Sequence, residues 1–226
     1  MIKIKTTAII KQCILATIMI SGIISCKDNT DKSIKEVPVE KPVKKNDEIL
    51  VENKADSINF KKLLSMQNIG FDVSTTGKGS IQQLTIQPSG LKIDNTKITA
   101  EVVGNVTNAE IEDLDSDGFP ELLIYTTSAG SGSYGDVIGY SVNNGKSISQ
   151  IYFPQVAENK EINGGYMGHD QFSIEKKMLV QRFKIYNKDD TNSNPTGQLR
   201  EIQYILKKGE AAKTFIVKKV SEYPEK

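Results

Sequence analysis

From residue 56 onward, apolar side chains occur in short or alternating runs, and none of these runs sustains a helical period. The runs fall at residues 71–73, 81–86, 98–103, 122–125, 137–142, 148–153, 179–183, 202–206 and 215–220. Turn signals separate them, among them Pro88-Ser-Gly, Asn143-Asn-Gly and Asn194-Pro-Thr-Gly. We therefore expect an all-β fold: a single antiparallel β-sandwich or flattened barrel domain over residues 56–226.

The N-terminal segment differs sharply from this domain. Lysines at positions 3, 5 and 11 precede an apolar run over residues 13–24, which is short for a bilayer span and typical of a secretory signal. The run ends in Ile-Ile-Ser followed by Cys26, which resembles the lipobox of bacterial lipoproteins. We expect residues 1–25 to be a lipoprotein signal peptide and Cys26 to be acylated, so that it anchors the chain in a membrane.

A charged linker follows the cysteine. Residues 26–55 are rich in Lys, Asp and Glu, contain two prolines and show almost no apolar periodicity, so we expect a flexible tether. In many bacterial lipoproteins an Asp directly after the acylated cysteine favours retention in the inner membrane. Lys27 stands at that position here, so the resemblance points to a lipid anchor in the outer membrane of the cell envelope. Asp28 and Asp31 leave surface export open, so the sequence decides neither the periplasmic face nor the cell surface.

Charge and cysteine content exclude several other classes. The formal net charge of +1 gives no signal for nucleic acid or for an anionic membrane surface, so no nucleic-acid partner is expected. The two cysteines are Cys13, in the signal, and Cys26. The mature chain would therefore have no thiol for a disulfide or a metal, and its stability must come from the core.

An acidic turn over residues 113–121 is the best metal candidate. Asp113, Asp115 and Asp117 alternate in a tight turn, and Glu121 could complete a short calcium loop. An EF-hand would need a bidentate Glu at its twelfth position, which is Ile124 here. The alternative is that the Asp side chains cap their own backbone and Asp117-Gly118 makes the turn. We expect no cofactor, apart from a possible structural calcium ion.

A Ser/Gly-rich loop connects two predicted strands after this turn. It carries one large side chain, Tyr134, among small ones, which suits a surface tip that contacts a partner. The candidate binding residues are Gly130, Ser131, Gly132, Ser133, Tyr134 and Gly135.

Enzyme motifs compete for the same residues but lack their other parts. The Gly-x-Gly-x-x-Gly pattern of dinucleotide-binding folds needs a helix directly after it, whereas a strand is predicted here. The kinase glycine loop has no His-Arg-Asp or Asp-Phe-Gly elsewhere in the chain, and neither Ser131 nor Ser133 has the flanking glycines of a nucleophile elbow. His169, the only histidine, is interpreted as structural, although a Ser-His-Asp triad would be possible only through it. We expect no enzyme activity.

Three segments occur in the order of a known family. DLDSDGFPEL, SAGSGSYG and GYMGHDQF, at residues 113–122, 128–135 and 165–172, resemble the periplasmic inhibitors of invertebrate-type lysozyme over residues 60–223. The resemblance implies an all-β domain that protects the bacterial wall by inserting a Ser-Gly-x-Tyr loop, here residues 131–134, into the lysozyme cleft. It also implies that the GYMGHD segment belongs to the fold and is not a catalytic centre.

The competing hypothesis is an exported surface lipoprotein that binds glycan or calcium. The acidic turn is the feature in its favour. Sugar-binding faces usually display large aromatic platforms, and the chain contains no Trp.

Overall fold

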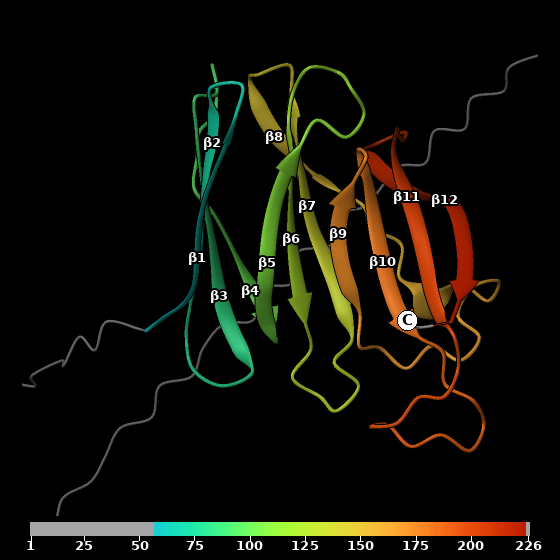
Figure 1. The fold of residues 1–226 in the computed structure, drawn as a ribbon. Coiled ribbons are helices and arrows are strands. Elements are labelled where there is room, and N and C mark those ends of the chain that lie inside the picture. The colour runs from blue at the N-terminus through green and yellow to red at the C-terminus, as the bar shows by residue number, and fades with distance from the viewer. Residues whose placement is uncertain (1–56, 225–226) are drawn as a thin grey trace, which may run out of the picture. The chain divides into compact units, whose positions relative to one another are not determined.

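In the computed structural model, which describes residues 57–224, the chain forms three antiparallel sheets of four strands each (Figure 1). In every sheet the strands follow one another in chain order, because each is joined to the next by a turn or loop that reverses the chain. The expected signal peptide, acylated Cys26 and tether lie outside the described residues.

The strand boundaries define the three sheets. The N-terminal sheet contains β1 (Ile58–Met66), β2 (Ile69–Thr76), β3 (Ile81–Ser89) and β4 (Ile98–Val103). The middle sheet contains β5 (Asn105–Glu112), β6 (Glu121–Thr127), β7 (Gly135–Asn143) and β8 (Ser147–Ile151). The C-terminal sheet contains β9 (Gln171–Glu175), β10 (Met178–Lys184), β11 (Leu199–Lys208) and β12 (Lys213–Tyr223). A 3₁₀ turn, η1 (Val156–Glu158), precedes β9.

The middle sheet is buried on both faces. Leu122 and Ile124 of β6 belong to a core shared with the N-terminal sheet, which includes Phe71. Leu123 and Tyr125 belong to a second core shared with the C-terminal sheet. Because successive side chains of a strand point to opposite faces, β6 contributes side chains to both cores, and its central residues 122–125 are all apolar.

The prediction of an antiparallel all-β fold is confirmed, with three stacked sheets in place of a two-sheet sandwich. No sheet among the described residues closes into a barrel, so the flattened-barrel alternative does not apply. Each outer sheet buries one face against the middle sheet, and this burial needs no closure. Within residues 57–224 there is no helix with the length and apolar character that a membrane span requires.

The hairpin at residues 143–146 forms where its turn signal predicts it. Asn144 and Gly145 both have positive φ, 51° and 68°, which is the backbone of the tight hairpin turns that favour Asn-Gly. The Lys146 amide donates to the Asn143 carbonyl over 2.9 Å and closes the turn between β7 and β8.

Candidate functional site

The Ser/Gly loop, residues 128–135, connects β6 to β7 and is closed by its own hydrogen bonds. The Ser128 amide donates to the Tyr134 carbonyl over 2.8 Å, and the Tyr134 amide donates to Ser128 Oγ over 2.9 Å. The Ser133 amide donates to the Gly130 carbonyl over 3.0 Å. The six predicted binding residues therefore lie together in one ordered turn. β7 begins at Gly135, so a strand follows the loop. The dinucleotide-binding pattern requires a helix at this point, and the structure does not have one there.

The GYMGHD segment supports this loop directly. The His169 amide donates to the carbonyls of Gly132, over 2.9 Å, and Ser133, over 3.2 Å. The backbone of Gly168 is left-handed, with φ of +85°, and a Cβ atom there would collide with the Gly132 carbonyl oxygen. The two segments can therefore come this close only because residue 168 is glycine.

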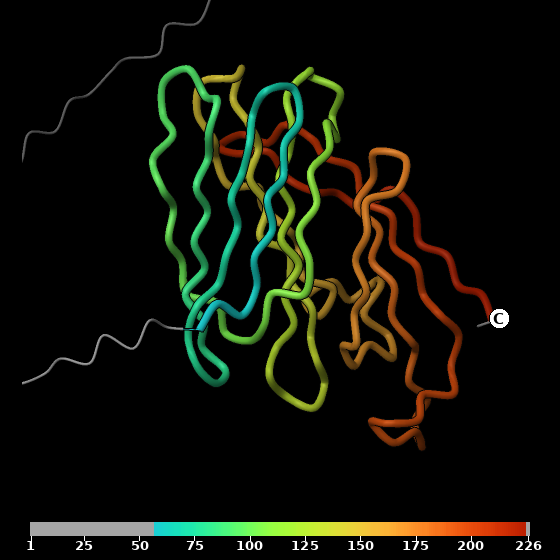
Figure 2. Tube along the Cα trace, turned by 60° about the vertical axis from the view of Figure 1, so that its left-hand side comes forward, coloured from blue at the N-terminus to red at the C-terminus, as the bar shows by residue number. Residues whose placement is uncertain are grey.

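The loop between β10 and β11 supports the Ser/Gly loop as well. Asn192 Nδ2 donates to the Ser131 carbonyl over 2.7 Å, and the Tyr186 hydroxyl donates to the Asn192 carbonyl over 2.8 Å. The Tyr186 ring stacks on the His169 ring at a centroid distance of 6.2 Å. Figures 1 and 2 show the Ser/Gly loop and the loop after β10 at the same end of the sheets.

Asp170 anchors the base of the Ser/Gly loop to the C-terminal sheet. Its Oδ2 atom accepts hydrogen bonds from the Gly135 amide and the Tyr166 hydroxyl, each over 2.7 Å. Its Oδ1 atom accepts from Gln181 Nε2 over 2.7 Å, and Gln181 Oε1 accepts from the buried Tyr204 hydroxyl over 2.7 Å. The carboxylate thus joins the loop, the GYMGHD segment and strands β10 and β11 in one network.

Burial raises the pKa of Asp170 above its ordinary value, and the hydrogen bonds from Tyr166, Gly135 and Gln181 oppose this shift. A protonated carboxyl group would have to give up an acceptor position in this network. Burial, together with the neighbouring charge of Asp170, also raises the pKa of Tyr166, so its hydroxyl stays a donor. The network is complete when Asp170 is ionised.

Tyr134 and Ser131 are the exposed side chains of the loop that can make polar or aromatic contacts, and Ala129 is exposed beside them. The Tyr134 side chain packs on one side against Tyr166, with ring centroids 5.6 Å apart at 69°, and its ring lies over Gly132. Tyr134 nevertheless keeps 43% of its surface exposed, and Ser131 is exposed at the tip. The loop therefore offers a ring with a fixed orientation and a hydroxyl group to solvent.

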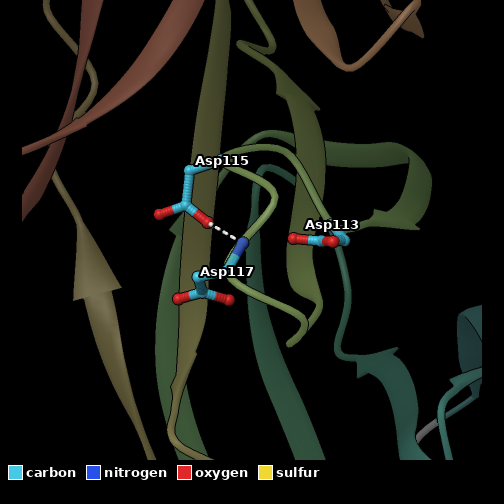
Figure 3. Close-up of side chains that lie close together, drawn as sticks. All are labelled: Asp113, Asp115 and Asp117. Carbon is cyan, nitrogen blue, oxygen red and sulfur yellow. Dashed lines mark hydrogen bonds between the residues drawn. The ribbon is translucent and has the colours of Figure 1, made fainter.

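The acidic turn, residues 113–121, lies at the other end of β6. Its Asp side chains partly cap their own backbone: the Asp117 amide donates to Asp115 Oδ1 over 3.3 Å (Figure 3), and the Phe119 amide donates to Asp117 Oδ1 over 2.9 Å. Carboxylate oxygens of Asp113, Asp115 and Asp117 lie within 4.8 Å of one another. The predicted grouping of these three residues is therefore present, and it agrees with both the capping and the metal interpretation.

Glu121 is fully buried beneath the turn. Its Oε2 atom accepts from the Leu114 amide over 2.9 Å, and its Oε1 atom accepts from Ser141 Oγ over 2.7 Å. Burial raises the pKa of Glu121, and these hydrogen bonds oppose the shift.

Lys213, at the start of β12, supplies a cation to the acidic turn. Its Nζ atom lies 2.6 Å from Asp115 Oδ2, 2.8 Å from Asp117 Oδ2 and 3.1 Å from Glu121 Oε1. Burial lowers the pKa of Lys213, but the hydrogen bonds to Asp115 and Asp117 and the charge of Glu121 outweigh it, so the net shift is upward. No local sequence pattern points to Lys213, because it lies more than ninety residues from the turn along the chain.

Comparisons of the chain with family models, curated proteins and solved structures find no match. The geometry of the Ser/Gly loop and the resemblance of the three sequence segments are therefore the basis for a functional proposal.

Proposed function

We propose that this chain is an inhibitor of invertebrate-type lysozyme and protects the bacterial cell wall by placing the Ser/Gly loop in the active-site cleft of that enzyme. The observation that carries the proposal is an exposed Ser131 and a 43% exposed Tyr134 on a loop that is tied down from two neighbouring segments. The resemblance of residues 131–134 to the inhibitory Ser-Gly-x-Tyr loop supports the same assignment.

The chemistry of a lysozyme cleft suits these two side chains. Glycosidases of this kind use carboxyl groups on both sides of the scissile bond, and their subsites accept flat amphipathic rings. In the proposal, the Ser131 hydroxyl donates a hydrogen bond to a catalytic carboxylate and the Tyr134 ring fills a sugar subsite. Gly130 and Gly132 keep the loop narrow enough to enter the cleft.

The contacts that support the Ser/Gly loop would preorganise it for binding. A free Ser/Gly loop would lose conformational entropy on binding, and this loss would weaken the complex. Here the hydrogen bonds from Asn192 and His169, together with Asp170 at the base, hold the loop before any partner arrives. A large part of that entropic cost is therefore met during folding.

In the same proposal, the protein acts in the cell envelope, held by the lipid on Cys26. An outer-membrane anchor would keep the inhibitor at the wall that it protects, or at the surface where a host enzyme arrives first.

The proposal is tested by measuring inhibition constants against an invertebrate-type lysozyme for Ser131→Ala and Tyr134→Ala. Each substitution removes one contact of the kind that commonly carries ~1.4 kcal/mol or more, so each should weaken inhibition about tenfold or more. The thermal unfolding midpoint should stay nearly unchanged, because Ser131 is exposed and Tyr134 packs on one side only and lies outside both cores. Tyr152→Ala, which removes a tyrosine that is 59% exposed next to β12, is the matched control and should inhibit like the native chain. Full inhibition by both loop variants would place the inhibitory surface elsewhere.

A further inference from the structure

The acidic turn holds four carboxylates, and two lysines of the C-terminal sheet reach into it. Lys213 contacts Asp115, Asp117 and Glu121, while Lys177 lies 3.5 Å from Asp113 Oδ2 and donates to Ser116 Oγ over 3.1 Å. The positive charges therefore come from the C-terminal sheet, and the negative charges come from the middle sheet.

The contacts of Lys213 match the bonding capacity of an ammonium group. A lysine Nζ atom has three N–H donors and no acceptor, and three carboxylate oxygens surround it here at 2.6, 2.8 and 3.1 Å. The backbone of Lys213 is fixed as well, because its carbonyl accepts a hydrogen bond from the Tyr152 amide over 3.0 Å. The Phe215 amide, two residues further on, donates to the Tyr152 carbonyl over 3.0 Å. The ammonium group is thus held in place from both ends of the side chain.

We propose that the Lys213 ammonium is the resident cation of the acidic turn, and that it occupies the position where such a turn would otherwise hold a calcium ion. Alternating carboxylates on a tight turn are the ligands that a hard cation prefers. Glu121 is fully buried and needs a positive partner, because an unpaired buried carboxylate is strongly destabilising. Lys213 meets this need and also links the middle sheet to β12.

The proposal has a consequence for the native chain and another for a variant without the lysine. The native protein folds without calcium, because the Lys213 side chain already supplies a cation that offsets part of the negative charge of the turn. Removal of the ammonium group leaves three carboxylate oxygens directed at one point, and a divalent ion then binds there. A cavity of about 410 Å³ borders Asp115, Asp117 and Lys213, so a hydrated ion can reach them.

The experiment compares thermal unfolding of the native chain, Lys213→Met and Lys213→Arg, each with a chelator and with millimolar calcium chloride. Lys208→Met is the matched control, since Lys208 is exposed in the same β11–β12 hairpin and borders the same cavity. With chelator, Lys213→Met should unfold about 5 °C or more below the native chain, and Lys213→Arg should lie between them. Calcium should raise the midpoint of Lys213→Met and leave the native and Lys208→Met midpoints unchanged.

Three results would overturn the proposal. A native midpoint that rises with calcium as much as that of Lys213→Met would show that the turn takes a metal ion despite the lysine. A Lys213→Met midpoint that equals the native one, or that does not respond to calcium, would show that the ammonium does not stand in for an ion. If Lys213→Met fails to fold with chelator, recovery of the fold on adding calcium, followed by near-ultraviolet circular dichroism, decides the question. Inhibition of lysozyme is a separate readout, because the Ser/Gly loop is at the far end of β6, roughly 20 Å away.

Discussion

Gly168 allows the GYMGHD segment to approach the Ser/Gly loop closely. Its left-handed backbone costs an alanine ~1–2 kcal/mol, and the added Cβ would also collide with the Gly132 carbonyl. Gly168→Ala should therefore push the Ser/Gly loop away, weaken lysozyme inhibition about tenfold or more, and lower the unfolding midpoint by several degrees.

The matched control for this variant lies directly before the GYMGHD segment. A Cβ atom at Gly164 would meet no heavy atom within 4 Å, so Gly164→Ala should change neither property. Inhibition constants measured well below both unfolding midpoints make the comparison. Equal inhibition by the two variants would mean that the GYMGHD segment does not position the loop.

The residues of the Ser/Gly loop and of the acidic turn could be selected from the sequence, whereas the side chains that hold each of them from another sheet could not. Tyr134 stands out locally, because it is the one large side chain among glycines and serines. Asp170 and Lys213 stand out only in three dimensions: Asp170 reaches Gly135 across thirty-five positions, and Lys213 reaches Glu121 across ninety-two. Such long-range pairs depend on sheet stacking, which no local pattern contains.

The apolar run of β6 predicts a strand from the sequence, but the sequence does not show that this strand is buried on both faces. A continuous apolar run of this length fits either a strand covered on both faces or a buried helical segment, and its periodicity alone does not separate these two cases. The structure gives Leu122 and Leu123 to two different cores. The turn signals predicted some of the hairpins, such as the one at residues 143–146, and they carried no information on how the three sheets would stack.

Arg182 joins all four strands of the C-terminal sheet on its outer face. Its guanidinium group contacts Glu175 on β9 over 2.6 Å and Glu201 on β11 over 2.7 Å, and the Tyr223 hydroxyl on β12 donates to Glu201 over 2.9 Å. The hydrogen bond to Arg182 lowers the pKa of Glu175 below its ordinary value of 4.5. Burial raises the pKa of Glu201, but its hydrogen bonds lower the pKa by a larger amount, so the net shift is also downward.

These two shifts predict the pH dependence of an Arg182→Met variant. A carboxyl group whose pKa is depressed by folding stabilises the protein above its unfolded value, near 4.5, and loses that contribution as the pH falls through the folded pKa. At neutral pH the variant should lose ~1 kcal/mol, a modest value because Glu175 is about half exposed, and its midpoint should fall by ~2–4 °C.

The difference in unfolding midpoint between the native chain and Arg182→Met should then shrink as the pH falls below about 4.5. Lys219→Met, at an exposed position of β12, is the control and should show no such trend. Thermal unfolding scans from neutral to acid pH provide the measurement. A difference that stays constant over this range would mean that the carboxylates do not act through Arg182.

The whole domain places its two polar features at opposite ends of one buried strand. β6 begins at Glu121, beneath the acidic turn, and ends at Thr127, next to the Ser/Gly loop. Cores on both faces keep this strand rigid, so the loop projects from a fixed base and the turn is closed by lysines of the adjacent sheet. The sequence predicted the class of fold, but the third sheet follows from packing, which only the structure supplies.

The most direct test of the proposed function is a lysis assay with the purified domain, residues 56–226, and three enzymes: invertebrate-type, chicken-type and goose-type lysozyme. Lysis of bacterial walls is followed with each enzyme in the presence and absence of the domain. The proposal predicts that lysis by the invertebrate-type enzyme falls with rising domain concentration, and that Tyr134→Ala requires about tenfold more protein for the same effect. Undiminished lysis by the invertebrate-type enzyme at all domain concentrations would contradict it.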